Sequence, residues 1–503
     1  YDNDGDQDLL FVNSTYWENK VPAGKEPGTA ALFQNDGKGH YKEITASSGL
    51  DIPIYGMGVS FGDYNADGWT DVFITAVGAN HLFQNLGNGK FLDVSAEAGV
   101  AGDAQEWSTC STWFDFDNDG DLDLFVGNYV RWTPEIDLQV GWKLVGIGRA
   151  YGQPKDFQGT FPYLYRNEGN GKFSDISEAA EIRIKNSAMG TPAGKSLGVA
   201  AVDVNGDGWM DLIVANDTVQ NFLYLNQKNG TFKEIGGRSG IAFDSFGATR
   251  GAMGIDVARY REDETLGVVI GNFANEMTAL YVAQPGPDIL FTDEALTEGI
   301  GAPSRLPLKF GVFFFDFDLD GRLDLLTANG HLEEEISKIQ KSQRYRQSAQ
   351  LFWNCGPQKS GCFAPVTSGS AGVDLFTPIV GRGSAYADID GDGDLDVILT
   401  QVGGRPLLLR NDQNLGHHWI RLKLTGKKGN REAIGAWVHA RAGGKDIWRQ
   451  VTSTRSYLSQ SELPITIGLG KETGTELLEV KWPDGTQQKF KAELDRITDL
   501  VQM

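Results

Sequence analysis

Asp115-Phe-Asp-Asn-Asp-Gly-Asp-Leu-Asp-Leu-Phe-Val-Gly-Asn128 decides the fold, because it joins an acidic loop to a run of β-forming residues. Carboxylates at alternate positions of a short loop can direct their oxygens to one point, and Ca²⁺ takes about six to eight oxygen ligands. Gly120 permits the sharp turn that such a loop needs. Without a cation the clustered carboxylates would repel one another. The stretch therefore predicts a calcium loop that leads into a β-strand.

The same nonapeptide, Asp-x-Asp/Asn-x-Asp-Gly-x-x-Asp, recurs along the chain as DYNADGWTD at Asp63, DVNGDGWMD at Asp203, DFDLDGRLD at Asp316 and DIDGDGDLD at Asp388. YDNDGDQD at Tyr1 lacks only the first Asp, so we expect the chain to begin inside a repeat. A β-type run follows each loop where an EF-hand would continue into a helix. Oxygen-only ligands also disfavour zinc and copper.

We predict that the side chains at positions 1, 3, 5 and 9 and the backbone carbonyl at position 7 bind about five to six Ca²⁺ ions in all. The predicted metal residues are Asp2, Asp4, Asp6, Asp8, Asp63, Asn65, Asp67, Trp69, Asp71, Asp115, Asp117, Asp119, Asp121, Asp123, Asp203, Asn205, Asp207, Trp209, Asp211, Asp316, Asp318, Asp320, Arg322, Asp324, Asp388, Asp390, Asp392, Asp394 and Asp396.

The fifth repeat has lost the acidic pattern. Met253-Gly-Ile-Asp-Val-Ala-Arg-Tyr260 matches the segment before the other loops, but only Asp256 remains of the acidic set. We expect no calcium in this repeat and expect Arg259 to supply positive charge there. Replacement of Asp256 by Ala should therefore matter less than replacement of Asp119.

A second unit follows each loop and predicts a β-hairpin, because an Asn-x-Gly type turn lies between two alternating segments. LFQNDGKGHYKEIT is the first copy, and the copies begin at Leu32, Leu82, Leu164 and Leu223, with looser versions at Leu280, Leu351 and Leu408. Each repeat then supplies about four antiparallel strands, the content of one propeller blade. We predict an all-β chain with a seven-bladed β-propeller over residues 1–415.

Acidic loops are not found after residue 415, and alternating stretches such as Trp419-Ile-Arg-Leu-Lys-Leu take over. This pattern predicts a small antiparallel β-sandwich-like domain over residues 416–503.

Two long insertions interrupt the repeats, at residues 131–162 and 330–350. The charge pattern of the second insertion predicts a short surface helix.

Composition excludes some partners. The formal net charge of −22 argues against nucleic acid, which needs a basic surface. The chain has no apolar run of roughly 18 residues, so no membrane span is expected.

The cysteines allow one disulfide. Cys355 and Cys362 frame a short loop that a disulfide could close in an oxidising compartment, and we expect Cys110 to be a small buried residue.

The segment FGDYNADG from Phe61 resembles FG-GAP/VCBS repeats, the calcium-loop blades of integrin α-subunit propellers. Thr160-Phe-Pro-Tyr-Leu-Tyr-Arg-Asn and Ala328-Asn-Gly-His-Leu are similar to the cartilage acidic protein family. The segments Ala433-Ile-Gly-Ala and Val480-Lys-Trp-Pro-Asp-Gly resemble the ASPIC/UnbV domain that ends those proteins. The resemblance implies secretion, calcium binding and contacts with other molecules.

These observations favour a binding protein over an enzyme. We predict a secreted, periplasmic or cell-surface calcium-binding propeller that acts as an adhesion, binding or scaffold module, with an extracellular protein or glycan as partner and a larger assembly as one possibility. No catalytic motif or metal-spaced histidine set occurs. The alternative is a calcium-dependent polysaccharide lyase or hydrolase, which would draw residues from the insertions: Tyr151, Lys155, Asp156, Arg344 and Tyr345.

Overall fold

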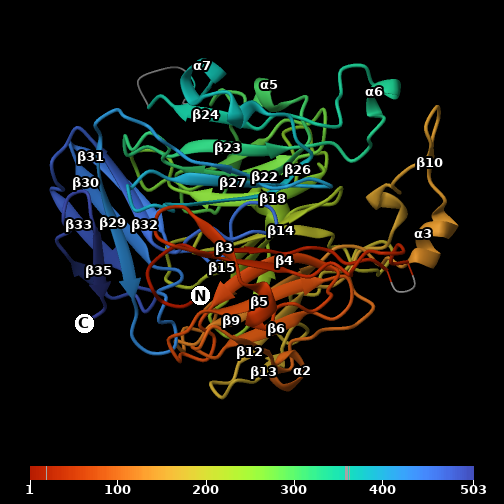
Figure 1. Ribbon diagram of the computed structural model, residues 1–503, viewed down its shortest axis with the longest axis horizontal. Helices are drawn as coiled ribbons and strands as arrows, with labels where there is room; N and C mark the ends of the chain where they lie inside the picture. Colours follow the sequence, from red (N-terminus) through yellow and green to blue (C-terminus); the bar gives the residue numbers. More distant parts are fainter. Residues whose placement is uncertain (18–19, 357–360, 362) are drawn as a thin grey trace.

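The computed structural model describes residues 1–17, 20–356, 361 and 363–503, and its regular secondary structure consists mainly of β-strands (Figure 1). This confirms the predicted all-β class. The predicted Cys355–Cys362 pairing lies outside the described residues because Cys362 is not among them. Within the described ranges, no helix combines the length and apolar character needed to cross a membrane.

The repeats form seven antiparallel sheets within the described chain, and the strands of each sheet pair in chain order. Sheet 1 contains β1 (Leu9–Phe11), β2 (Ala31–Asn35) and β3 (Tyr41–Glu43); sheet 2 contains β4 (Gly56–Gly62), β5 (Asp71–Ala76), β6 (His81–Asn85) and β7 (Phe91–Asp93); sheet 3 contains β8 (Ser108–Phe114), β9 (Asp123–Asn128), β12 (Tyr163–Asn167) and β13 (Phe173–Asp175); sheet 4 contains β14 (Ser196–Val202), β15 (Asp211–Asn216), β16 (Phe222–Asn226) and β17 (Phe232–Glu234); sheet 5 contains β18 (Ala252–Ala258), β19 (Gly267–Asn272), β20 (Ala279–Ala283) and β21 (Phe291–Asp293); sheet 6 contains β22 (Lys309–Phe315), β23 (Asp324–Asn329), β24 (Gln350–Asn354) and β25 (Phe363–Pro365); sheet 7 contains β26 (Gly381–Ala387), β27 (Asp396–Gln401) and β28 (Leu407–Leu409).

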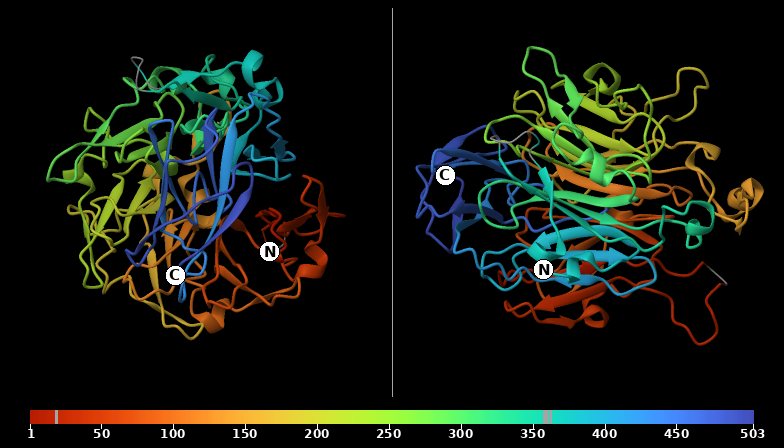
Figure 2. Two further views of the ribbon diagram at one scale, coloured as in Figure 1. Left: turned by 90° about the vertical axis from the view of Figure 1, so that its left-hand side faces the viewer. Right: turned by 90° about the horizontal axis from the view of Figure 1, so that it is seen from above.

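The first strands of sheets 2 to 7 lie innermost. Each of them contacts the first strand of the next sheet, in the order β4, β8, β14, β18, β22 and β26. The left panel of Figure 2 looks onto the C-terminal domain, and the sheets pass around that domain in chain order. β1 follows loop 1–8, so it corresponds to the second strand of the other sheets.

Each acidic loop joins the first strand of its sheet to the second. Loop 115–123, for example, connects β8 to β9. Because this connection recurs in sheets 2, 3, 4, 6 and 7, the acidic loops gather at one end of the sheets. The C-terminal domain packs against that end, as the hydrogen bonds described below show.

The C-terminal domain consists of two sheets. One has the order β32-β29-β35, with β29 (His418–Thr425), β32 (Ile465–Gly470) and β35 (Ile497–Val501); the other has the order β31-β30-β33-β34, with β30 (Trp437–Ala442), β31 (Lys445–Gln450), β33 (Leu477–Lys481) and β34 (Gln487–Lys489). β29 and β35 run parallel, so the expectation of a purely antiparallel domain is wrong. Along β29, the apolar residues Ile420, Leu422 and Leu424 alternate with Arg421 and Lys423, which suits two sheets packed face to face.

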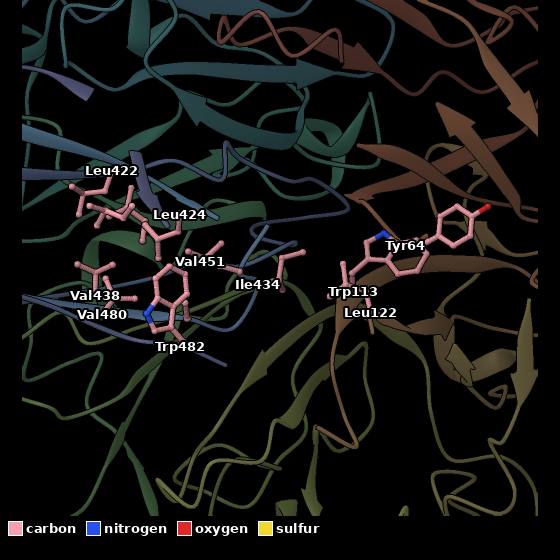
Figure 3. Packing of buried hydrophobic residues seen from close by; sticks show 14 of the residues in the cluster. Tyr64, Trp113, Leu122, Leu422, Leu424, Ile434, Val438, Val451, Val480 and Trp482 are labelled. Carbon is pink, nitrogen blue, oxygen red and sulfur yellow. The ribbon is translucent and has the colours of Figure 1, made fainter. Parts of the chain in front are cut away.

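The core of this domain is continuous with that of the repeats. Trp482 and Val438 belong to the same buried cluster as Trp113 and Tyr64 of sheets 3 and 2. Figure 3 shows Ile434 between the two groups. The boundary near residue 416 therefore separates two sequence patterns but not two independent cores.

Helices are short. The repeats carry single turns at α1 (Thr45–Ser48), α2 (Ser95–Ala98), α4 (Gly236–Ser239), α5 (Gly301–Ser304) and α7 (Ser368–Ala371), with 3-10 turns at Pro154–Asp156 and Asp374–Phe376. Insertion 131–162 projects from the body with α3 (Pro134–Val140) and the small hairpin of β10 (Lys143–Leu144) and β11 (Gly148–Arg149) (Figure 1). Insertion 330–350 contains the predicted surface helix as α6 (Ile336–Ile339), which is one turn long.

Candidate metal loops

Three acidic loops bring carboxylates together. One oxygen from each of three side chains lies within 4.8 Å of the others in Asp115, Asp117 and Asp123, in Asp316, Asp318 and Asp320, and in Asp388, Asp390 and Asp396. All these residues were predicted as ligands. The loops of the third, sixth and seventh repeats therefore bring three predicted ligands close together.

In loops 115–123 and 316–324, the two oxygens of the first Asp have different surroundings. Asp115 Oδ2 accepts the backbone N–H of Gly120 at 3.0 Å, and Asp316 Oδ2 accepts that of Gly321 at 3.0 Å. Asp115 Oδ1 and Asp316 Oδ1 are buried and have no hydrogen-bond partner in the described chain. A buried carboxylate oxygen without a partner is costly unless a cation neutralises it. The donor set thus fits a hard, oxygen-binding cation.

Burial changes the acidity of these groups. The pKa of Asp115 is raised to about 7, by desolvation first and then by the charges of Asp119 and Asp117. The pKa of Asp316 is raised to about 8 by burial, although the neighbouring Arg449 opposes the rise. Carboxylates in such surroundings favour either a proton or a metal ion.

The last Asp of each loop has a structural role that the sequence did not predict. Asp123 Oδ2 accepts the N–H of Phe116 at 3.1 Å, and its Oδ1 accepts the N–H of Asn167 at 2.8 Å. Asp211, Asp324 and Asp396 make the same pair of bonds in their sheets. Position 9 therefore closes the loop and ties it to the third strand of the sheet.

A buried asparagine at the end of the third strand links neighbouring sheets. Asn167 Nδ2 donates to Leu122 O at 3.1 Å in its own loop and to Tyr64 O at 2.8 Å in the loop of sheet 2. The equivalent bonds to the preceding sheet come from Asn85, Asn226, Asn354 and Asn411, and from Asn35, which reaches Ile389 O in sheet 7 at 2.8 Å.

From the sequence, these asparagines were predicted only as residues of the hairpin turn. Their recurrence at the same place in LFQN, LYRN and LYLN could have indicated a shared structural role. The equivalent residue of sheet 5 is Ala283, so the metal-poor repeat also lacks this side-chain link.

Several other predicted ligands form hydrogen bonds and ion pairs with neighbouring side chains. In loops 63–71 and 203–211 the asparagine at position 3 donates to the next aspartate, with Asn65 Nδ2 lying 3.0 Å from Asp67 Oδ2. In loop 1–8, Asp2 Oδ2 accepts from Gln34 at 2.8 Å. The Arg322 side chain, at position 7, pairs with Asp320 and Glu262.

The fifth repeat differs from its prediction. Asp256 lies within β18, three residues before the loop begins, so it is not a remnant of the acidic set. Its Oδ2 accepts the N–H of Phe314 at 2.8 Å, and its Oδ1 accepts from Arg455 of the C-terminal domain at 2.6 Å. Arg259 takes the place of the first loop Asp, and its guanidinium lies 4.3 Å from the ring centres of both Trp437 and Trp448.

A polar segment of the C-terminal domain, residues 451–464, lies among the innermost strands. We name it the plug segment. Ser453 Oγ accepts the N–H of Trp113 at 3.0 Å, Ser456 exchanges two backbone bonds with Ile255, and Gln460 Oε1 accepts the N–H of Phe61 at 2.7 Å. Inner strands have a free edge whose N–H and C=O groups need partners. The plug segment supplies those partners to sheets 2, 3 and 5.

The residues considered for enzymatic chemistry have structural contacts. Tyr151 is 69% exposed, and its N–H donates to Glu333 Oε1 at 3.0 Å, which joins the two insertions. Arg344 donates to the carbonyls of Lys341 and Gln343, while the Tyr345 carbonyl accepts from His331 N at 2.9 Å. Lys155 and Asp156 form a 3-10 turn.

Family comparison agrees with this architecture. The family model for the FG-GAP-like repeat matches residues 1–74, 63–126, 150–214 and 203–270, and that for ASPIC and UnbV matches residues 426–501. The chain is therefore an FG-GAP-repeat protein with a C-terminal ASPIC and UnbV domain, as its motifs predicted.

Its curated relatives include cartilage acidic protein 1. The Xenopus tropicalis protein is 26% identical over 313 residues, which is 60% of this chain and 44% of the relative. The human protein is 25% identical over 294 residues, 57% of this chain and 41% of the relative. The matched part of this chain thus spans less than half the length of these relatives. The resemblance to the cartilage acidic protein family is confirmed.

Among solved structures, an Agrocybe aegerita lectin specific for non-reducing terminal N-acetylglucosamine is similar, with a TM-score of 0.44 and 15% identity. The match covers 80% of this chain and 90% of the lectin. This likeness is too distant to transfer a ligand.

Proposed function

We propose that the seven sheets are the blades of a β-propeller and that its acidic loops bind calcium. The order of the inner strands supports the ring, as does the bond from Asn35 in sheet 1 to Ile389 in sheet 7. The observation that carries calcium binding is the pair of buried, unpartnered oxygens of Asp115 and Asp316, two residues whose carboxylates each lie close to those of two further aspartates. About five to six ions per chain are proposed, with none in the fifth blade.

Isothermal titration of the metal-stripped chain with Ca²⁺ tests this proposal. We expect five or six ions to bind, and Asp115→Asn to remove one of them. Asp103→Asn is the control, because Asp103 is exposed and lies outside the loops. Failure to bind calcium, or equal losses in the two variants, would refute the proposal.

We further propose that the protein is secreted or displayed outside the cell and acts as an adhesion, binding or scaffold module. The names of its relatives support an extracellular matrix setting. Insertion 131–162 gives a surface for a protein or glycan partner, since Leu138 and Val145 are 64% and 96% exposed on a segment that projects from the body (Figure 1). Leu138→Ser and Val145→Ser should weaken partner capture from extracellular material without lowering the melting temperature.

A polysaccharide lyase or hydrolase remains the alternative function. The plug segment hydrogen-bonds to the inner strands of sheets 3 and 5, so it would fill the centre of the proposed ring, and this activity would need a site elsewhere on the surface. Incubation with a panel of polysaccharides, with and without chelator, tests it. Calcium-dependent release of oligosaccharides would favour the enzyme.

A further inference from the structure

Loop 316–324 is clasped by the C-terminal domain. The N–H of Gly468 lies 3.3 Å from Asp316 Oδ2, the N–H of Gly470 donates to Leu319 O at 2.9 Å, and Lys445 Nζ donates to Asp320 O at 3.1 Å. β32 and β31 thus cover the outer side of this loop. A Cβ atom on Gly468 would lie 2.3 Å from the Leu319 carbonyl carbon, which shows how closely the two backbones approach.

Arg449 completes the clasp without blocking the carboxylate cluster. Its Nη2 lies 3.3 Å from Asp316 Oδ2 and 3.2 Å from Gly321 O. Oδ1, the other oxygen of Asp316, is buried and keeps no hydrogen-bond partner in the described chain, and one oxygen of Asp316 lies within 4.8 Å of oxygens of Asp318 and Asp320. The guanidinium therefore engages one oxygen of Asp316 and leaves the other free for a cation.

The loop holds several buried carboxylates. Asp316 and Asp324 are each 1% exposed and Asp318 is 9% exposed. With Asp320, the loop carries four carboxylates. Among the described residues, Arg449 and Arg322 form ion pairs with them, and Arg322 also pairs with Glu262. Two guanidinium groups do not balance the four carboxylates when all of these are ionised, and burying the remaining negative charge without a cation would be costly.

We propose that a calcium ion in loop 316–324 locks the C-terminal domain onto the repeats, so that ion binding and domain docking favour each other. This inference rests on the proposed calcium binding. Linkage makes the coupling reciprocal: the factor by which docking strengthens ion binding equals the factor by which the ion strengthens docking.

Loop 203–211 provides the comparison within the same chain. No hydrogen bond or ion pair between its residues and the C-terminal domain is found in the described structure. Its polar contacts are with the repeats, among them Asn118, Lys228 and Asn226, and the domain approaches it only as a packing neighbour, with Gly435 near the Met210 side chain. Calcium in this loop should stabilise sheet 4 without affecting the domain.

Hydrogen exchange of the full chain, titrated with Ca²⁺, tests the lock. We expect calcium to protect peptides covering 316–324, 203–211 and 465–470. In Asp318→Asn, protection of 465–470 should need about tenfold more calcium, whereas Asp207→Asn should affect only its own loop. If 465–470 responds identically in the two variants, the lock is refuted. If calcium protects neither acidic loop in the unmodified chain, the proposed calcium binding fails instead.

The effect of domain docking on calcium binding can be tested at Gly468, where the backbone of β32 approaches the loop closely. Gly468→Ala should push β32 from the loop and raise the calcium concentration that half-protects 316–324 by about tenfold, leaving 203–211 unchanged. Gly474→Ala is the matched control, because a Cβ atom there meets nothing within 4 Å. An unchanged titration of 316–324 in a folded Gly468→Ala chain would overturn the coupling. If that variant does not fold, the Asp318→Asn comparison decides.

Discussion

Arg455 of the C-terminal domain donates from Nη1 to Asp256 Oδ1 at 2.6 Å, 199 residues away in the chain and within β18, the inner strand of sheet 5. The side chains are 11% and 2% exposed. The ion pair is thus a buried contact between the plug segment and the one repeat that lacks an acidic loop.

Asp256→Ala should lower the free energy of unfolding by about 3 kcal/mol or more, because it leaves the Arg455 charge buried without its partner. This reverses the expectation drawn from the sequence, which gave Asp256 a minor role. Denaturant unfolding in excess calcium measures the effect. Asp412→Asn is the control, since Asp412 forms an exposed ion pair with Arg410 and should change stability by under about 1 kcal/mol. A small effect at Asp256 would show that the pair is dispensable.

Removal of calcium should lower the melting temperature, because a ligand bound only by the folded state stabilises it by mass action. Asp119→Ala should give part of the same decrease, and chelator should then have less further effect on that variant. Calorimetry with chelator, followed by calcium addition, checks this. A melting temperature indifferent to chelator would contradict calcium binding.

Stability should depend on pH through His331. Burial and then the charge of Arg382 lower the pKa of its imidazole from 6.5 to about 4. Between these pH values the unfolded chain gains a proton that the folded chain does not, so stability falls as the pH decreases, by roughly 3 kcal/mol in total. Unfolding of His331→Gln in saturating calcium should lose this component. The control His40→Gln should keep this pH-dependent component, since the His40 side chain is 79% exposed.

Asn226→Ala should weaken the link between sheets 3 and 4. Asn226 Nδ2 donates to Phe116 O at 2.7 Å and to Met210 O at 3.2 Å, and both carbonyls would lose a buried partner. We expect a loss of about 1 to 3 kcal/mol in unfolding free energy. Asn229→Ala, in the exposed hairpin turn, should have little effect. Equal losses of unfolding free energy in the Asn226→Ala and Asn229→Ala variants would contradict a special role for the asparagine at the end of the strand.

The local pattern of the sequence predicted what depends on local geometry. Alternating carboxylates and a glycine define a loop within nine residues, so Asp115 and Asp316 could be placed before their surroundings were known. The role of Asn167 depends on a carbonyl from another repeat, and that of Asp256 on an arginine from another domain. Neither partner is encoded nearby.

The plug segment was missed for a related reason. Its Ser- and Thr-rich sequence has neither the periodicity of a strand nor that of a helix, because its groups pair with the edges of several strands in turn. The parallel alignment of β29 and β35 likewise depends on the path of the chain between them and not on the pattern of either strand.

The bond between Asn35 and Ile389 has a consequence for biosynthesis. At about 5 to 20 residues per second, the ribosome needs roughly 20 to 70 s to add the 354 residues that separate the two partners. During this interval the first sheet exists in the nascent chain without its final neighbour, and the surface that this neighbour will cover is open to other chains. Translation speed and chaperone protection therefore bear on the yield of this protein more than on that of a chain whose neighbouring sheets are made in succession.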